Sequence, residues 1–157
     1  MIKVKKHTEG DSRVAKELPS IKDFDTANRD HIADVVNLVS EFSKILKQQV
    51  VNHDFTKVFE PYRSMFYRDL CNTIDGKMNF MDGEWAKIHY YEKERHHLKE
   101  HSPDDVNLFD VIEMICDCVV ASKARGGKCE VDIPTDLLVN AVQNTVSLLE
   151  DRVEVIE

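Results

Sequence analysis

Hydrophobic residues recur at intervals of three and four along most of the chain, which is the spacing of an amphipathic helix. The pattern predicts a first helix from Asp25-Thr26, either of which can cap it, to about Val51. Almost no segment alternates as a strand would, so the fold class is predicted to be all-α, a bundle of about five main helices. The other four helices are expected over residues 58–73, from Gly83 past Leu98, from Pro103 to Gly126, and from Thr135 to Asp151.

The remaining segments carry little periodic signal. Residues 1–25 are polar and are interpreted as a mobile N-terminal arm, and residues 26–157 as a single domain. Residues 129–133 alternate like a short strand but have no evident partner, so an extended loop is predicted there. Residues 153–157 are expected to fray.

Composition places the chain among ordinary globular proteins, with 42% hydrophobic and 32% charged residues in a length of 157. No apolar run is long enough to span a bilayer, and the N-terminus lacks the apolar stretch of a signal peptide. A cytoplasmic protein without membrane contact is therefore expected. The formal net charge of −8 argues against general binding to a nucleic-acid backbone, but it leaves open a nucleotide substrate at a metal centre.

His53 and Asp54 are the first candidates for chemistry. An imidazole nitrogen beside a carboxylate oxygen suits zinc, manganese or iron. Asp54 could instead cap the next helical turn, although a cap leaves His53 without a role. His31 lies upstream within about 60° of the apolar stripe of the first helix, so it is expected to point toward the core. A lone histidine there could be a hydrogen-bonded core residue, and the pair 22 residues later favours a metal ligand.

The fourth predicted helix is apolar over most of its circumference, which is typical of a buried helix. Asp110, Glu113 and Asp117 form one acidic stripe on it, since the first two lie within about 40° of the third. An unpaired buried carboxylate is costly, so a buried stripe must meet a cation, a metal or a cleft. A stripe that faces water is the alternative. Glu113 and Asp110 could orient a ligand histidine or activate water.

Histidines are dense in the third predicted helix, where four fall within 13 residues: His89, His96, His97 and His101. The first two are seven apart and the last two four apart, so each pair is expected to share a helical face and could bind one ion. Charged residues surround them, and a solvated helix end is an equally good interpretation for any one of these histidines.

The order H…HD…D, with HD followed by x-x-K, resembles the HD-domain superfamily of metal-dependent phosphohydrolases. The segments HDFTKVFEPY, RHHLKEH and NLFDVIEMICDCVVAS are similar to an uncharacterised family of small HD-like proteins from bacteria and phages, over residues 28–150. The resemblance implies an HD-like helical bundle that holds a divalent cation with His31, His53, Asp54 and Asp117. Likeness to HD-GYP-type proteins further implies that His96 and His97 help to hold a second ion.

The function implied by this resemblance is a divalent-metal-dependent phosphohydrolase acting on a nucleotide, either a nucleoside monophosphate or a deoxynucleotide. One or two ions of Mn, Fe, Zn or Mg are expected as cofactor. Lys57 and Arg95 are expected to offset charge on the phosphate. A phosphodiesterase of a signalling nucleotide, including one serving phage counter-defence, and a non-catalytic metal-stabilised module that binds a protein are the alternatives. The sequence leaves a homo-oligomer possible.

Overall fold

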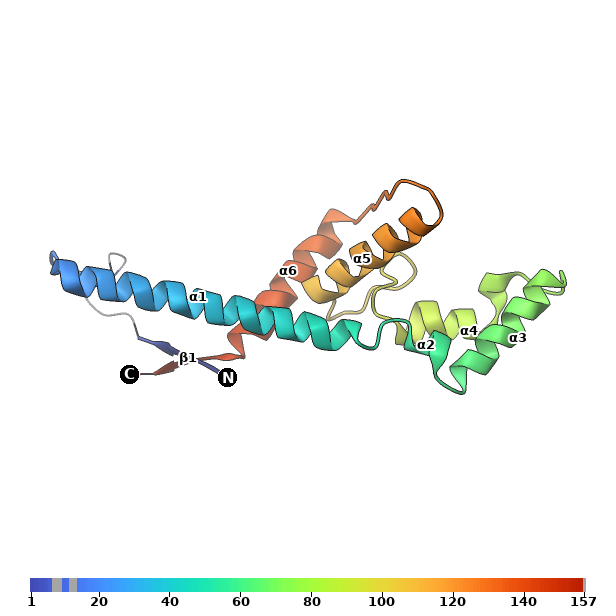
Figure 1. Cartoon of the computed structure of the whole chain (residues 1–157), viewed down its shortest axis with the longest axis horizontal. Helices are drawn as coiled ribbons and strands as arrows, with labels where there is room; N and C mark the ends of the chain where they lie inside the picture. Colours follow the sequence, from blue (N-terminus) through green and yellow to red (C-terminus); the bar gives the residue numbers. More distant parts are fainter. Residues whose placement is uncertain (7–9, 12–13, 157) are drawn as a thin grey trace. The chain divides into compact units, whose positions relative to one another are not determined.

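The computed structural model covers the whole chain and describes residues 1–6, 10–11 and 14–156 (Figure 1). It is mostly helical with one small sheet, which confirms the predicted all-α class. The chain forms two compact units, one made of residues 1–47 and 146–157 and the other of residues 48–145. In the described part of the chain, no helix is both long enough and apolar enough to cross a membrane.

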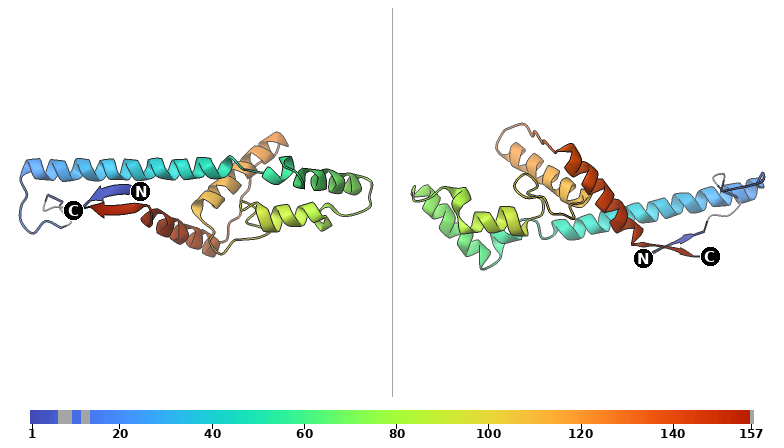
Figure 2. Two further views of the ribbon diagram at one scale, coloured as in Figure 1. Left: turned by 90° about the horizontal axis from the view of Figure 1, so that it is seen from below. Right: turned by 180° about the vertical axis from the view of Figure 1, so that it is seen from behind.

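The first unit holds a two-stranded parallel sheet that joins the two ends of the chain (Figure 2). Strand β1 (Ile2–Lys5) pairs with β2 (Val153–Ile156), with Ile2 opposite Val153. Residues 2–5 were expected in a mobile arm and residues 153–157 to fray, and both interpretations are wrong for the strand residues. Each strand has only four residues, and neither can satisfy its backbone groups without the other, 151 positions away in sequence.

Helix α1 (Ile21–Val50) begins and ends close to its predicted limits. None of its residues, all of which are described, is fully buried, and Val35 and Val39 are 48% and 59% exposed. Its expected core stripe is therefore only half-buried at Leu38, Phe42 and Ile45. A helix needs an opposing apolar surface to bury a stripe. Apart from α1 itself, the described residues of the first unit offer only two short strands and the last turn of a second helix as regular structure.

Short helices open the second unit: α2 (Phe55–Val58), α3 (Tyr62–Ile74), the 3-10 turn η1 (Phe80–Asp82), α4 (Glu84–Lys87) and the π-helical segment η2 (Ile88–Lys93). The helix predicted over 58–73 is broken before Pro61, since a residue that precedes proline is disfavoured in helical conformation. Trp85 is 1% exposed, and its ring packs 4.2 Å from that of Phe66 and 5.6 Å from that of Phe80.

Helices α5 (Leu108–Ala124) and α6 (Thr135–Glu150) lie side by side (Figure 1). A hydrophobic core between them includes Val111, Met114 and Ala141, and residues of the intervening extended loop pack against it. Helix α5 starts four residues later than predicted from Pro103-Asp104, because Asn107 and Asp110 form a capping box: the Asn107 side chain accepts hydrogen bonds from helix N–H groups, and the Asp110 carboxylate accepts one from the Asn107 N–H.

Candidate metal centre

His53 and Asp54 lie in the turn between α1 and α2, at the start of the second unit. The turn leaves the helical path at Asp54, whose φ of 57° and ψ of 28° are left-handed. Aspartate adopts this conformation more readily than most residues do. Both side chains can therefore face the same way, which two adjacent residues within a helix cannot do.

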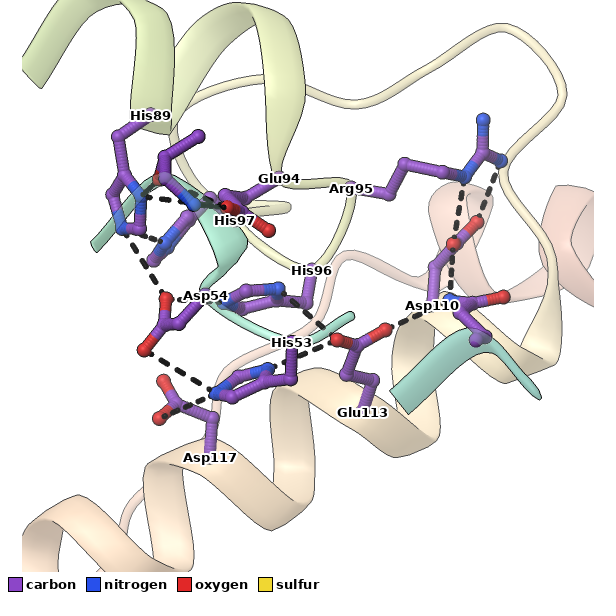
Figure 3. Close-up of polar contacts among 12 residues, drawn as sticks. His53, Asp54, His89, Glu94, Arg95, His96, His97, Asp110, Glu113 and Asp117 are labelled. Atoms are coloured by element: carbon purple, nitrogen blue, oxygen red, sulfur yellow. Dashed lines mark hydrogen bonds and ion pairs between the residues drawn. The ribbon is translucent and has the colours of Figure 1, made fainter. Parts of the chain in front are cut away.

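Three residues of the histidine-rich segment, His89, His96 and His97, lie beside His53 and Asp54 (Figure 3). His89 is fully buried on η2, and π-helical segments are frequent at functional sites. The helix ends at Lys93, so His96 and His97 lie in the following turns rather than on the helix predicted to run past Leu98. Helical spacing therefore does not relate these histidines: His97 meets His89, while His101 is exposed.

Three imidazole nitrogens surround the Asp54 carboxylate at closely similar spacings. His53 Nε2 lies 3.5 Å from Asp54 Oδ2, while His89 Nε2 and His96 Nε2 lie 3.6 and 3.8 Å from Asp54 Oδ1. His97 Nε2 lies 2.8 Å from His89 Nε2, and Asp117 Oδ1 lies 3.6 Å from His53 Nε2. The nitrogen–oxygen spacings exceed a hydrogen bond, but ligands about 2.1 Å from one tetrahedral ion are separated by about 3.4 Å.

Two groups of potential ligands share Asp54. One comprises His53, Asp54 and His96, and the other comprises Asp54, His89 and His97; within each group the ligand atoms all lie within 4.8 Å of one another. A carboxylate with two oxygens can serve two ions at once, one on each side. The residues present could therefore hold one ion or two, and Asp54 would be a ligand in either group.

Hydrogen bonds at the far side of the imidazole rings fix which nitrogen faces Asp54. Thr56 donates its hydroxyl proton to Glu94 Oε1 at 2.9 Å, so its oxygen can only accept from His89 Nδ1, 2.7 Å away. Glu113 Oε1 likewise accepts from His53 Nδ1 at 2.9 Å. With Nδ1 protonated in both rings, each Nε2 presents a lone pair to the centre of the cluster, which is the orientation a metal ligand needs.

Three buried polar atoms test whether this cluster fits a cation. Among the described side chains, Asp54 Oδ1 and both ring nitrogens of His96 are buried without a hydrogen-bond partner. His96 Nδ1 lies 3.4 Å from Glu113 Oε1, which is an electrostatic contact without hydrogen-bond geometry. Buried polar atoms without partners are rare in proteins because they are costly. Coordination by an ion would satisfy Asp54 Oδ1 and His96 Nε2 together, so the donor set fits a divalent metal.

The protonation states of His89, His97, Glu113 and Asp54 also favour the binding of a metal ion. Burial lowers the pKa of His89 to about 3, and burial together with the neighbouring His96 lowers that of His97 to about 4, so both rings are neutral at neutral pH. Burial opposes the ionisation of Glu113, but the close contact with His96 and hydrogen bonds from Gln49 and His53 hold its pKa down to about 2. Burial also opposes the ionisation of Asp54, and Lys57 outweighs it to lower that pKa.

Of the residues predicted to act, the structure brings eight into or against the cluster: His53, Asp54, Lys57, His89, His96, His97, Glu113 and Asp117. His31 is not among them. It lies on the exposed part of α1 that belongs to the first unit, about five helical turns before Val50. His101 is exposed and belongs to neither group.

Arg95 and Asp110 differ from their predicted roles. The Arg95 guanidinium donates to both oxygens of Asp110, at 2.9 and 2.8 Å, and to Asp105 Oδ1 at 3.0 Å. These contacts, with Asp110 fully buried, raise the pKa of Arg95 still further, chiefly through the hydrogen bonds to Asp110. Arg95 is thereby engaged as a structural partner rather than presented to a phosphate, and Asp110 pairs with it instead of orienting a histidine.

Three contributing residues were not identified from the sequence: Gln49, Thr56 and Glu94. Gln49 donates to Asp110 Oδ1 at 2.9 Å and to Glu113 Oε2 at 2.8 Å, which connects the two carboxylates. Glu94 accepts from both the backbone N–H and the hydroxyl of Thr56. Thr56 offered one signal, since it stands two residues after Asp54 in the motif that the sequence singled out.

Comparison with known proteins places the chain in a family without giving it an activity. No curated protein and no solved structure matches it. One family model, described as a family of unknown function (DUF5662), matches residues 20–154. Because the match covers most of the chain, the protein belongs to this family.

Proposed function

We propose that the protein is a cytoplasmic, divalent-metal-dependent phosphohydrolase that acts on a nucleotide. One observation carries the proposal: Asp54 stands between two sets of imidazole nitrogens whose opposite ring nitrogens, in His53 and His89, are held by Glu113 and Thr56. This places lone pairs from several elements around one carboxylate. The resemblance of HD-x-x-K and the later Asp117 to the HD-domain superfamily supports the same reaction and suggests the nucleotide class, while the first histidine of that pattern, His31, lies outside the cluster.

The donor set suits the metals expected for such an enzyme. Imidazole nitrogens and carboxylate oxygens bind Zn, Mn and Fe, and no thiolate lies in either group among the described residues. Divalent ions held there would polarise a phosphoryl oxygen and lower the pKa of a water molecule toward neutrality. Neutral His89 and His97 are ready to coordinate without first losing a proton.

Hydrolysis of a phosphomonoester forms one P–O bond to water and breaks the P–O bond to the leaving alcohol, with one proton moving from water to that alcohol. Asp117 is the carboxylate suited to accept the water proton, since it faces His53 Nε2 and its side chain stays 33% exposed. Lys57 contacts Asp54 Oδ2 and keeps a side chain 37% exposed. It is the cation closest to the shared carboxylate, so it can offset charge on the phosphoryl oxygens.

The decisive experiment combines metal analysis with a hydrolysis screen. Purified protein should contain one or two equivalents of Mn, Fe or Zn and should release phosphate from nucleoside or deoxynucleoside monophosphates when Mn is added. Asp54→Asn should lose both properties, while His101→Asn, in the same histidine-rich segment but outside both groups, should keep them. Turnover that survives in Asp54→Asn would refute the proposal. Bound metal without turnover would instead favour the non-catalytic metal-stabilised module.

A further inference from the structure

A groove begins at Asp117 and continues away from the cluster along the C-terminal half of α5. It has a volume of about 300 Å³ and is lined by residues that include Asp117, Ser122, Arg125 and Lys128. This volume is at the lower end of the range for small-molecule sites. Asp117 and Arg125 are eight residues apart on one helix, so about 12 Å of helix separates their backbones.

The charges in this groove change sign along its length. Its inner end adjoins the acidic cluster through Asp117. Its outer end carries the two cations of Arg125 and Lys128 and one carboxylate, that of Glu130, so positive charge is in excess there. Arg125 donates its Nε–H to the Ala121 carbonyl at 2.9 Å, so its side chain leans back over the preceding turn, toward Asp117. Within the described part of the chain, neither Arg125 nor Lys128 makes an ion pair with a carboxylate. Both cations are therefore available to an external anion.

Asp117 places the groove and the cluster next to each other. It lines the groove, and its Oδ1 lies 3.6 Å from His53 Nε2. A ligand anchored at the cluster would therefore reach the cations at the outer end of the groove by passing Asp117.

We propose that this groove binds a second phosphate of the substrate, so that the preferred substrate carries two phosphate groups separated by a spacer. The reacting phosphate would lie at the cluster, and the other would be held by Arg125 and Lys128. This inference rests on the proposed function for the reacting end. A guanidinium that pairs with a phosphate through two hydrogen bonds raises affinity by about tenfold or more.

A basic residue near the C-terminus of a helix also stabilises the helix dipole, and the control must separate this role from binding. Lys123 supplies this control, because it is basic, exposed, in the last turn of α5 and outside the groove. Arg125→Gln, Lys128→Gln and Lys123→Gln each remove one positive charge from the same end of the helix. Only the first two remove a cation from the groove.

The test is calorimetric titration of metal-loaded protein with adenosine 5′-monophosphate and with adenosine 3′,5′-bisphosphate. The parent protein should bind the bisphosphate at least tenfold more tightly. Arg125→Gln and Lys128→Gln should each lose most of that preference, with less than a twofold change for the monophosphate, and Lys123→Gln should match the parent. Equal affinities in the parent, no binding of either nucleotide, or an equal loss in Lys123→Gln would overturn the inference. Preferential binding of the bisphosphate without hydrolysis of either nucleotide would support the groove as a phosphate-binding site and would contradict the proposed phosphohydrolase activity.

Discussion

Thr56 Oγ1 lies 2.7 Å from His89 Nδ1, and this contact determines which ring nitrogen of His89 points at the cluster. Both residues are fully buried, so water cannot replace either partner. Because the Thr56 proton is donated to Glu94, the His89 ring must carry its own proton on Nδ1. The lone pair of Nε2 is then directed at Asp54 and His97.

Thr56→Val should therefore weaken metal binding although Thr56 touches no ion. Valine keeps the side-chain shape but removes the hydroxyl, so His89 loses its Nδ1 partner and Glu94 loses a donor. Loss of such an outer hydrogen bond typically costs 10- to 100-fold in metal affinity. The metal-free protein should also lose about 1–3 kcal/mol of stability. Thr56→Ser, which restores the hydroxyl, should recover the affinity in a chelator competition assay; equal affinity in Val and Ser variants would contradict the assigned role.

Asp54 combines a strained backbone with a buried oxygen that has no hydrogen-bond partner, so its replacement should not destabilise the metal-free protein. Glycine adopts the left-handed conformation without strain. Asp54→Gly is expected to unfold in urea with a free energy within about 1 kcal/mol of the parent or above it. Its metal content, measured by elemental analysis, should fall to background. A large loss of stability with metal retained would show that Asp54 is structural.

Local patterns in the sequence determined most of what could be predicted. Helical periodicity predicted the helix-rich fold class, and the motif around His53 and Asp54 led to the cluster. The capping box was also readable, as an asparagine followed three residues later by an aspartate at Asn107 and Asp110, and it would have set the start of α5 correctly. The strand pair β1 and β2 could not be predicted, because its two short strands lie at opposite ends of the chain.

The predicted roles of His31 and Arg95 were wrong because the sequence pattern does not give the distance between residues that are far apart along the chain. Helical phase gives the direction in which His31 points, but not its distance along the axis of a helix that continues to Val50. Arg95 resembled a phosphate ligand by type alone. Its actual partner, Asp110, is fixed by packing between the histidine-rich turns and α5, which no local pattern encodes.

Arg95→Gln should reduce stability rather than act first on catalysis. Asp110 is fully buried, and the change leaves its carboxylate without the guanidinium that neutralises it. Breaking such a pair from one side is expected to cost about 2–4 kcal/mol in urea unfolding. Asp105→Asn, which removes the exposed partner of the same arginine, should cost about 0.5 kcal/mol or less. Adding Asp110→Asn to Arg95→Gln should restore part of the loss; no recovery in this double variant would contradict the explanation.

The metal-free protein should lose stability as the pH falls below about 6.5. His89 and His97 have folded pKa values of about 3 and about 4, against an ordinary value of 6.5, so below pH 6.5 the unfolded chain binds protons that the folded chain does not. Each ring then contributes up to about 1.4 kcal/mol of destabilisation per pH unit.

His96 opposes this trend in the same pH range. Burial disfavours its charged form, but Glu113 outweighs burial and raises its pKa, so its protonation favours the folded state. The fold lowers the pKa of two histidines and raises that of only one. The free energy of unfolding should therefore still fall as the pH is lowered. Urea unfolding at pH 7.5, 6.5 and 5.5 measures it. His89→Gln should flatten the slope, whereas His101→Asn, which changes an exposed histidine outside the cluster, should leave it as in the parent. An identical slope in His89→Gln would show that His89 does not stay neutral in the folded protein.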